Sequence, residues 1–385
     1  PGPPPPTPGP DAAPRCFSHP APQGGNKAAG GWLAVGPGIA FPPEAARDTA
    51  MPLASLDFLT SLIAAASPSG YERPTARLYR DHVQPFAHKV TTDILGNVSA
   101  VINPDAAVRF MYAGHMDEVG FIVHHIDENG FLFFNTIGGT DVATEIGQRV
   151  QVHGHETVPG VVGRKAIQTF KAKDSNETPT LKDLWIDIGA GSREEAEKVA
   201  PIGSPVTIDA GFAMLGDSLA VGRAFDNKVG LLIGAKLLRC LAREGGVHPD
   251  VGFHILGTVQ EEIGSRGARV AGFHLAPRTA LAVDMGVAAD YPRGRPEDQG
   301  RLDLGKGPGI SQGANTNPVV FDLLAAAARL LADRVLDRFT AARPGVPVLR
   351  RHLGEVVADR IAEPGRRLGH NRESRPRIGP PEGPP

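Results

Sequence analysis

The sequence is organised by apolar strands that alternate with helices, a pattern that one long stretch of different character interrupts. Residues 120–208 carry short alternating strands separated by glycines, whereas the sequence on either side reads as buried strands and amphipathic helices. This arrangement predicts an α/β fold in which a mixed-sheet domain is interrupted by a small inserted all-β domain. The flanking strands and helices are expected at 108–114, 229–238, 251–259, 280–283 and 319–331.

The two ends of the chain differ from its middle. Residues 1–50 are rich in Pro, Gly and Ala and show no sustained periodicity, so we expect them to be disordered and Met51 to begin the folded chain. Residues 333–385 carry many Arg and Pro and form an atypical tail that is also expected to be disordered. The α/β domain is therefore predicted over 51–119 and 209–332, with 120–208 as the insertion.

Composition excludes several classes of protein. A formal net charge of -2 argues against a nucleic-acid-binding surface. No apolar run reaches the roughly 20 residues that a membrane span needs, so no membrane partner is expected. The two cysteines, Cys16 and Cys240, lie far apart and imply no disulfide framework, which favours a cytoplasmic location.

Five acidic or histidine side chains follow strands or begin a helix. His115, Asp284 and the pair Glu261 and Glu262 come at or just after apolar strands, and Asp226 precedes a helix. In an α/β sheet such positions converge on one crevice. A histidine with several carboxylates suits Zn, Co or Mn, and two such ions about 3.5 to 4 Å apart activate water and polarise a carbonyl group. The pattern therefore indicates metal-assisted amide hydrolysis.

Each of these residues also has a purely structural interpretation. Asp226 could be a helix N-cap, and Asp284 could be a turn residue. Neighbouring side chains of a strand point to opposite faces, so Glu261 and Glu262 could form a solvated strand end unless the chain turns there. Asp117 could accept the second N–H of a metal-bound imidazole, or it could be an exposed carboxylate.

Four segments carry a resemblance to a known family. They read AGHMDEVGF at 113–121, GRAFDNK at 222–228, TVQEEIGSRGA at 258–268 and VD at 283–284. In this order they resemble the motifs of the glutamyl and deblocking aminopeptidases, which are dinuclear metallopeptidases. The resemblance also includes 68–72, 93–97 and 307–310, and it extends over about 51–331.

The resemblance implies specific roles. It implies two divalent metal ions, Glu261 as general base and Asp117 as the partner that orients the histidine ligand. It also implies peptide substrates shortened from the N-terminus, and homo-oligomerisation through the inserted domain, up to a tetrahedral dodecamer. The implied metal ligands are His115 and Asp284 for one ion, Asp226 as the bridge and Glu262 for the second ion.

The tail departs from the family pattern. Members of the family complete the second metal site with a C-terminal histidine in a context like Tyr-Ile-His-Ser-Pro, which this sequence lacks. The tail histidines, His352 and His370, follow no strand-like run. The principal hypothesis is thus an aminopeptidase with an incomplete second metal site, and the alternative is a catalytically silent assembly subunit. A glycosidase is the weakest hypothesis, because a metal shell has no role between its two carboxylates.

Overall fold

The computed structural model describes residues 53–165, 179–216, 219–243, 245, 247–295, 297, 302–305, 307–339 and 355–357. The low-complexity segment predicted at 1–50 lies outside these residues, and so does most of the predicted tail. The predicted boundary at 332 falls inside a helix, α8 (Pro318–Phe339). Leu331, Val335 and Phe339 continue the helical spacing of the sequence past that boundary.

A six-stranded mixed sheet forms the frame of the α/β part. Its strands are β1 (Lys89–Thr92), β2 (Val98–Ile102), β3 (Val108–His115), β12 (Val251–Thr258), β13 (Thr279–Asp284) and β14 (Glu355–Val357). The order across the sheet is β1-β2-β12-β3-β13-β14. Strand β3 lies between β12 and β13 and runs parallel to both, with His115 opposite Thr258. The three strands therefore end at the same edge.

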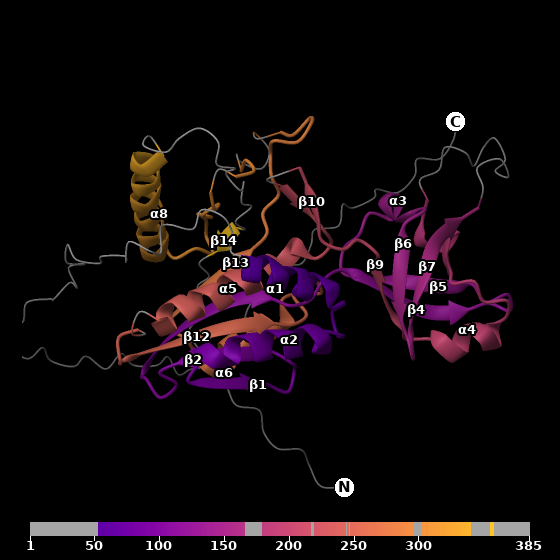
Figure 1. The fold of residues 1–385 in the computed structure, drawn as a ribbon, viewed down its shortest axis with the longest axis horizontal. Helices are drawn as coiled ribbons and strands as arrows, with labels where there is room; N and C mark the ends of the chain where they lie inside the picture. Colours follow the sequence, from indigo (N-terminus) through magenta and orange to yellow (C-terminus); the bar gives the residue numbers. More distant parts are fainter. Residues whose placement is uncertain are drawn as a thin grey trace, which may run out of the picture. The chain divides into compact units, whose positions relative to one another are not determined.

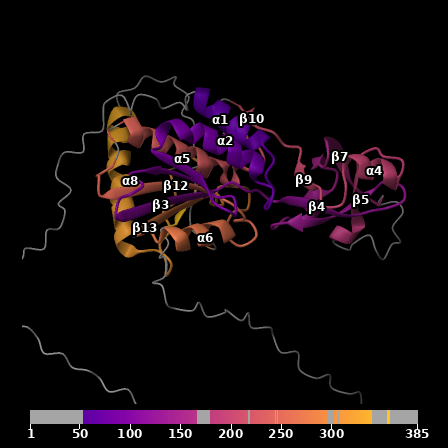
Figure 2. The same cartoon turned by 90° about the horizontal axis from the view of Figure 1, so that it is seen from below.

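Helices cover both faces of this sheet, as Figure 2 shows. The helices are α1 (Leu53–Ala64), α2 (Arg73–Val83), the 3-10 turn η1 (Gln84–Phe86), α5 (Phe225–Arg243) and α6 (Arg266–Leu275). Tyr112 of β3 packs in the core that α1, α2 and α5 contribute to, whereas Met111 and Ala113 pack with Ala271 of α6. Successive side chains of β3 thus alternate between two apolar layers, which explains its continuous apolar sequence.

Six strands between Gly120 and Ile208 close into a barrel with the order β4-β5-β8-β7-β6-β9 (Figure 1). Its core includes Phe121, Phe134 and Val150, which belong to a cluster distinct from the cores of the sheet. The strands are β4 (Gly120–Ile126), β5 (Leu132–Ile137), β6 (Arg149–His153), β7 (Thr157–Arg164), β8 (Leu184–Asp187) and β9 (Pro205–Ile208).

The segment of the barrel is not purely β. It also contains α3 (Val142–Glu145), the 3-10 turn η3 (Leu181–Asp183) and α4 (Arg193–Val199). Ser192 caps the start of helix α4, and its hydroxyl accepts the backbone N–H of Glu195 at 3.3 Å. The prediction of an all-β segment missed α4 because this helix is short and mostly charged. A hairpin of β10 (Ala213–Leu215) and β11 (Leu219–Val221) follows the barrel. None of the helices described is long and apolar enough to span a membrane.

Candidate metal centre

The side chains predicted to form a site do come together at the carboxyl edge of the parallel strands. His115 ends β3 and Asp284 ends β13, and the two lie 3.5 Å apart from Nε2 to Oδ1. The same Nε2 lies 3.0 Å from Oδ1 of Asp226 and 4.0 Å from Oε2 of Glu261. The convergence expected from an α/β sheet is therefore present in the structure.

Two groups of these side chains have the composition of a metal site. His115, Glu261 and Asp284 form one group, and His115, Asp226 and Glu262 form the other, with all ligand atoms of a group within 4.8 Å of one another. The groups divide the side chains differently from the resemblance, which gives Glu261 no ligand role. One imidazole and four carboxylates are donors that Zn, Co or Mn accepts, so the residues fit a centre for divalent ions.

The ring of His115 is oriented by the main chain next to it. Its Nδ1 lies 3.0 Å from the carbonyl oxygen of Asp117 and 3.4 Å from the carboxylate Oδ1 of the same residue. Asp117 thus contacts the ring, and its backbone oxygen is nearer to Nδ1 than its carboxylate is. With the Nδ1 proton donated there, Nε2 is left to face the carboxylates as a ligand.

The carboxylate of Asp117 is buried and holds the neighbouring segments. It accepts hydrogen bonds from Ser69 Oγ at 2.6 Å and from the backbone N–H groups of Glu261 at 2.9 Å and Glu262 at 3.0 Å. Burial raises the pKa of Asp117, but its interactions with His115 and these hydrogen bonds outweigh burial and lower it. The alternative of an exposed carboxylate is therefore wrong.

A tight turn explains how two adjacent glutamates face one site. Strand β12 ends at Thr258, and left-handed backbone follows at Gln260 (φ 55°), Gly264 (φ 116°) and Ser265 (φ 53°). The N–H of Gln260 donates to Oε1 of Glu72 at 3.1 Å. Two buried carboxylates, Glu72 and Asp117, thus bind three consecutive backbone amides, from Gln260 to Glu262. The family resemblance included 68–72 but gave Glu72 no role.

The two glutamates differ in their surroundings. Ser265 Oγ donates to Oε1 of Glu261 at 2.8 Å, which fixes one oxygen of that carboxylate. Burial, with the negative charge of Asp226, raises the pKa of Glu262 to about 7. Burial opposes protonation of His115, but its hydrogen bonds to Asp117, Asp226 and Asp284 hold its pKa well above the usual value. Crowded carboxylates around one imidazole favour a bound positive charge, which a divalent ion supplies.

Asp226 is not the helix cap that the structural interpretation required. The cap is its neighbour Asn227, whose Oδ1 accepts the N–H of Gly230 at 2.9 Å. Asn227 also donates from Nδ2 to the carbonyl oxygen of Val283 at 2.7 Å, which ties the start of α5 to the end of β13. The side chain of Asp226 is 55% exposed and is left free to face His115.

A buried lysine binds the backbone of the residue that follows His115. Lys228 is fully buried and donates from Nζ to the carbonyl oxygen of Met116 at 2.7 Å, to Thr75 Oγ1 at 2.9 Å and to Ser67 Oγ. Burial lowers the pKa of Lys228 to about 8. The sequence contained a signal for this role, because Lys228 shares the helical face of the buried Leu231 and Leu232.

An ion pair of Glu118 and Arg223 lies beside this lysine. The carboxylate of Glu118 accepts the N–H of Ser67 at 2.9 Å and is ion-paired with Arg223. Both residues lie in segments that carried the family resemblance, but neither had been assigned a role. The contacts of Glu118 join the loop before α2 to the end of the strand that carries His115.

Comparisons with known proteins identify relatives of this chain. The lysyl aminopeptidase of Pyrococcus furiosus is 34% identical over 74% of this chain and 78% of its own length. The crystal structure of a TET aminopeptidase from a marine sediment Thaumarchaeota archaeon matches with a TM-score of 0.68 and 31% identity, covering 72% of this chain and 79% of that chain.

A second similar structure is that of the TET1 peptidase of Pyrococcus horikoshii, which can assemble into a tetrahedron or a large octahedral shell. It matches with a TM-score of 0.61 and 24% identity over 70% of this chain and 80% of that chain, so it supports the fold alone. The sequence profile of the M42 glutamyl aminopeptidases matches residues 96–332. The resemblance read from the sequence is confirmed, and the chain belongs to the M42 glutamyl aminopeptidase family of peptidases.

Proposed function

We propose that this chain is a metal-dependent aminopeptidase that removes N-terminal residues from short peptides in the cytoplasm. The observation that carries the proposal is the pair of groups around His115 at the carboxyl edge of the sheet. When bound there, divalent ions supply a Lewis acid for the scissile carbonyl and lower the pKa of water. The residues that would hold them are His115, Asp226, Glu262 and Asp284.

Within this proposal Glu261 acts as the general base. Its Oε1 is held by Ser265, and its Oε2 faces the centre, 4.0 Å from His115 Nε2. A carboxylate held in this way can take a proton from the attacking water and pass it to the leaving amine. Asp117 orients both His115 and the backbone of Glu261, so it acts through its neighbours.

The second metal site is proposed to be the weaker one. In the assignment that the resemblance implies, His115 and Asp284 would hold the first ion, Asp226 would bridge the two ions, and Glu262 would be the one further ligand of the second ion. The tail histidines His352 and His370 lie outside the described residues. With fewer ligands of its own, the second ion should dissociate first when the free metal concentration is lowered.

The experiment measures metal content and hydrolysis of an aminoacyl anilide on the purified chain. Glu261→Gln is expected to lose at least about 100-fold in kcat because it removes the base. His115→Ala is expected to lose both metal and activity, whereas Glu194→Gln, an exposed change on α4, should lose neither. Two tightly held ions with full turnover would refute the weak second site.

The barrel at 120–208 is proposed to be an inserted assembly domain, with the catalytic domain formed by 51–119 and 209–332. The shared fold with the TET1 peptidase of Pyrococcus horikoshii, which can assemble into a tetrahedron, supports a homo-oligomer of that kind. Light scattering on the intact chain tests this, and a monomer at micromolar concentration would contradict it. A defined oligomer that binds no metal and lacks activity would instead support the silent assembly subunit.

A further inference from the structure

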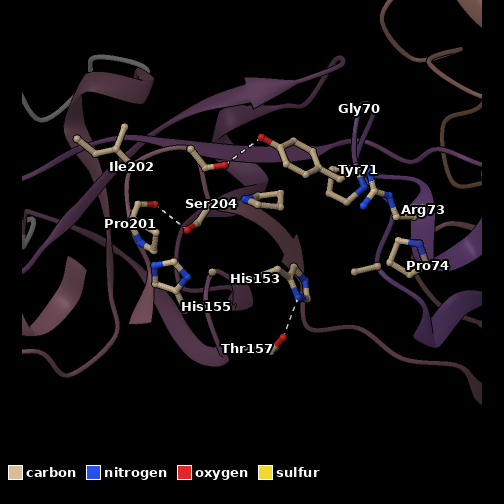
Figure 3. A pocket seen from close by; sticks show the side chains of 15 residues that line it. Gly70, Tyr71, Arg73, Pro74, His153, His155, Thr157, Pro201, Ile202 and Ser204 are labelled. Carbon is tan, nitrogen blue, oxygen red and sulfur yellow. Dashed lines mark hydrogen bonds between the residues drawn. The ribbon is translucent and has the colours of Figure 1, made fainter. Parts of the chain in front are cut away.

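A concave site lies between the residues that lead into α2 and those at the end of β6, and none of the metal-ligand candidates lines it. Its volume is about 760 Å³, within the size range of small-molecule sites. Figure 3 shows Arg73 and Pro74 on one side of this cavity, His155 and Pro201 on the other, and His153 between them.

Two cationic or protonatable side chains line the cavity without partners. Among the residues that the structure describes, no hydrogen bond or ion pair engages the guanidinium of Arg73 or the imidazole of His155. The lining contains no Asp or Glu. The adjacent Glu72 does not compensate Arg73 inside the cavity, because it is buried with Oε1 bound to two backbone amides.

The other polar groups of the cavity are already engaged. His153 contacts Thr207 Oγ1 from Nε2 at 2.9 Å and Thr157 Oγ1 from Nδ1 at 3.3 Å. Ser204 Oγ donates to the carbonyl oxygen of Pro201 at 2.6 Å. The unused hydrogen-bond donors of the side chains are therefore those of Arg73 and His155.

Apolar groups form the remaining wall. Pro68, Pro201 and Pro205 line the cavity, together with Ile202, which is 55% exposed. An exposed isoleucine among rigid prolines offers apolar contact area to a ligand. A site with this wall and a free guanidinium matches a molecule that joins an anionic group to an apolar one.

We propose that this cavity binds a small anionic molecule whose carboxylate or phosphate group is held by Arg73 and whose apolar part lies against Ile202 and the prolines. The guanidinium offers two parallel N–H donors to the two oxygens of such a group. An occupant would also rest against the loop at 68–72, whose Ser69 binds Asp117. The site is separate from the metal centre and does not depend on the proposed peptidase activity.

Isothermal titration calorimetry on the intact chain at constant ionic strength tests the proposal. The probes are inorganic phosphate and 3-phenylpropanoate, and the variant is Arg73→Gln. The matched control is Arg77→Gln, because Arg77 is exposed one turn further along α2 and does not line the cavity. We expect saturable binding of at least one probe, about tenfold weaker in Arg73→Gln and unchanged in Arg77→Gln.

The probes and the variants distinguish binding in this cavity from binding at the metal centre. Tighter binding of 3-phenylpropanoate than of phosphate would support contact of the apolar part with Ile202 and the prolines. Phosphate that binds at the metal centre would be insensitive to Arg73. The proposal is overturned if neither probe saturates, or if Arg73→Gln and Arg77→Gln weaken binding equally. Melting curves of the variants check that each remains folded.

Discussion

Two buried carboxylates control the backbone that presents the adjacent glutamates to the centre. Glu72 binds the amide of Gln260, and Asp117 binds those of Glu261 and Glu262. Neither carboxylate belongs to a candidate ligand group, so their effect on chemistry passes through the turn that they hold. Groups that orient ligands in this way typically contribute 10- to 100-fold to metal affinity or activity.

Substitution of Glu72 tests this arrangement at the scale of one residue. Glu72→Ala removes the acceptor for the amides of Gly70 and Gln260, and we expect about a 10- to 100-fold loss of kcat with reduced metal affinity. Glu72→Gln keeps an oxygen at the same place and should recover most of the loss. Equal activity of the two variants, measured by anilide hydrolysis and metal titration, would contradict a positioning role.

Helix α6 and strand β12 meet so closely that a glycine is required between them. Gly267 donates its N–H to the carbonyl oxygen of Val259 at 2.9 Å, and its own oxygen accepts from Asn97 Nδ2 at 3.0 Å. A Cβ at this position would lie 2.4 Å from Asn97 Oδ1 and 2.4 Å from the oxygen of Val259. This contact lies immediately before the turn that carries the two glutamates.

Gly267→Ala is therefore expected to destabilise the chain by about 1 to 3 kcal/mol, the usual cost of overpacking. Denaturant unfolding measures the change. Gly139→Ala is the control, because a Cβ there meets nothing within 4 Å. A destabilisation no larger than that of the control would show that β12 and α6 can move apart without loss of stability.

Strand β12 also carries a buried histidine that makes stability depend on pH. His254 is 8% exposed and its Nε2 has no hydrogen-bond partner among the described residues. Burial, with the nearby charge of Arg109, lowers the pKa of His254 to about 4. The folded state therefore binds fewer protons than the unfolded state, so stability is complete above about pH 6.5 and declines as pH falls toward 4.

For His254 we expect a loss of about 2 kcal/mol between pH 7.5 and pH 5, where the unfolded state is protonated and the folded state is not. His254→Leu removes this titration and should reduce the difference in melting temperature between the two pH values. The comparison is made on metal-free protein, so that release of metal does not contribute. An unchanged difference in the variant would exclude His254 as the cause.

At the scale of the whole molecule, the candidate centre joins β3, β12, β13 and α5 at one edge. Ions bound there would stabilise the folded chain by mass action, by about 2.7 kcal/mol at one hundred times the dissociation constant. We expect removal of metal by a chelator to abolish activity and lower the melting temperature, and a divalent ion to restore both. Equal melting temperatures with and without chelator would argue against a centre that bridges these elements.

The sequence predicted the residues of the metal centre better than the residues that hold them in place. His115, Glu261 and Asp284 could be placed together because parallel strands end at one edge. The role of Asp226 remained ambiguous between helix cap and metal ligand, because only the folded structure shows that Asn227 makes the capping bond. Lys228 was overlooked because a charged residue is ordinarily assigned to the surface, and its burial depends on acceptors far away in the sequence.

The closure of the barrel could also not be predicted from the sequence. Alternating apolar residues mark the strands β4 to β9, but they do not say which strands pair. The contact of Phe121 with Val206 joins the first strand to the last, and it depends on the twist of the strands between them. Helical periodicity likewise marked α8 without fixing its end.

The strand order has a consequence for synthesis on the ribosome. Strands β2 and β3 are not neighbours, because β12 lies between them, and β13 lies on the other side of β3. When residue 208 has been made, all six barrel strands are available to pair, yet β3 still has no native partner. The backbone N–H and C=O groups along both edges of β3 stay unpaired until β12 emerges, so truncated chains that stop before Val251 are expected to associate rather than fold.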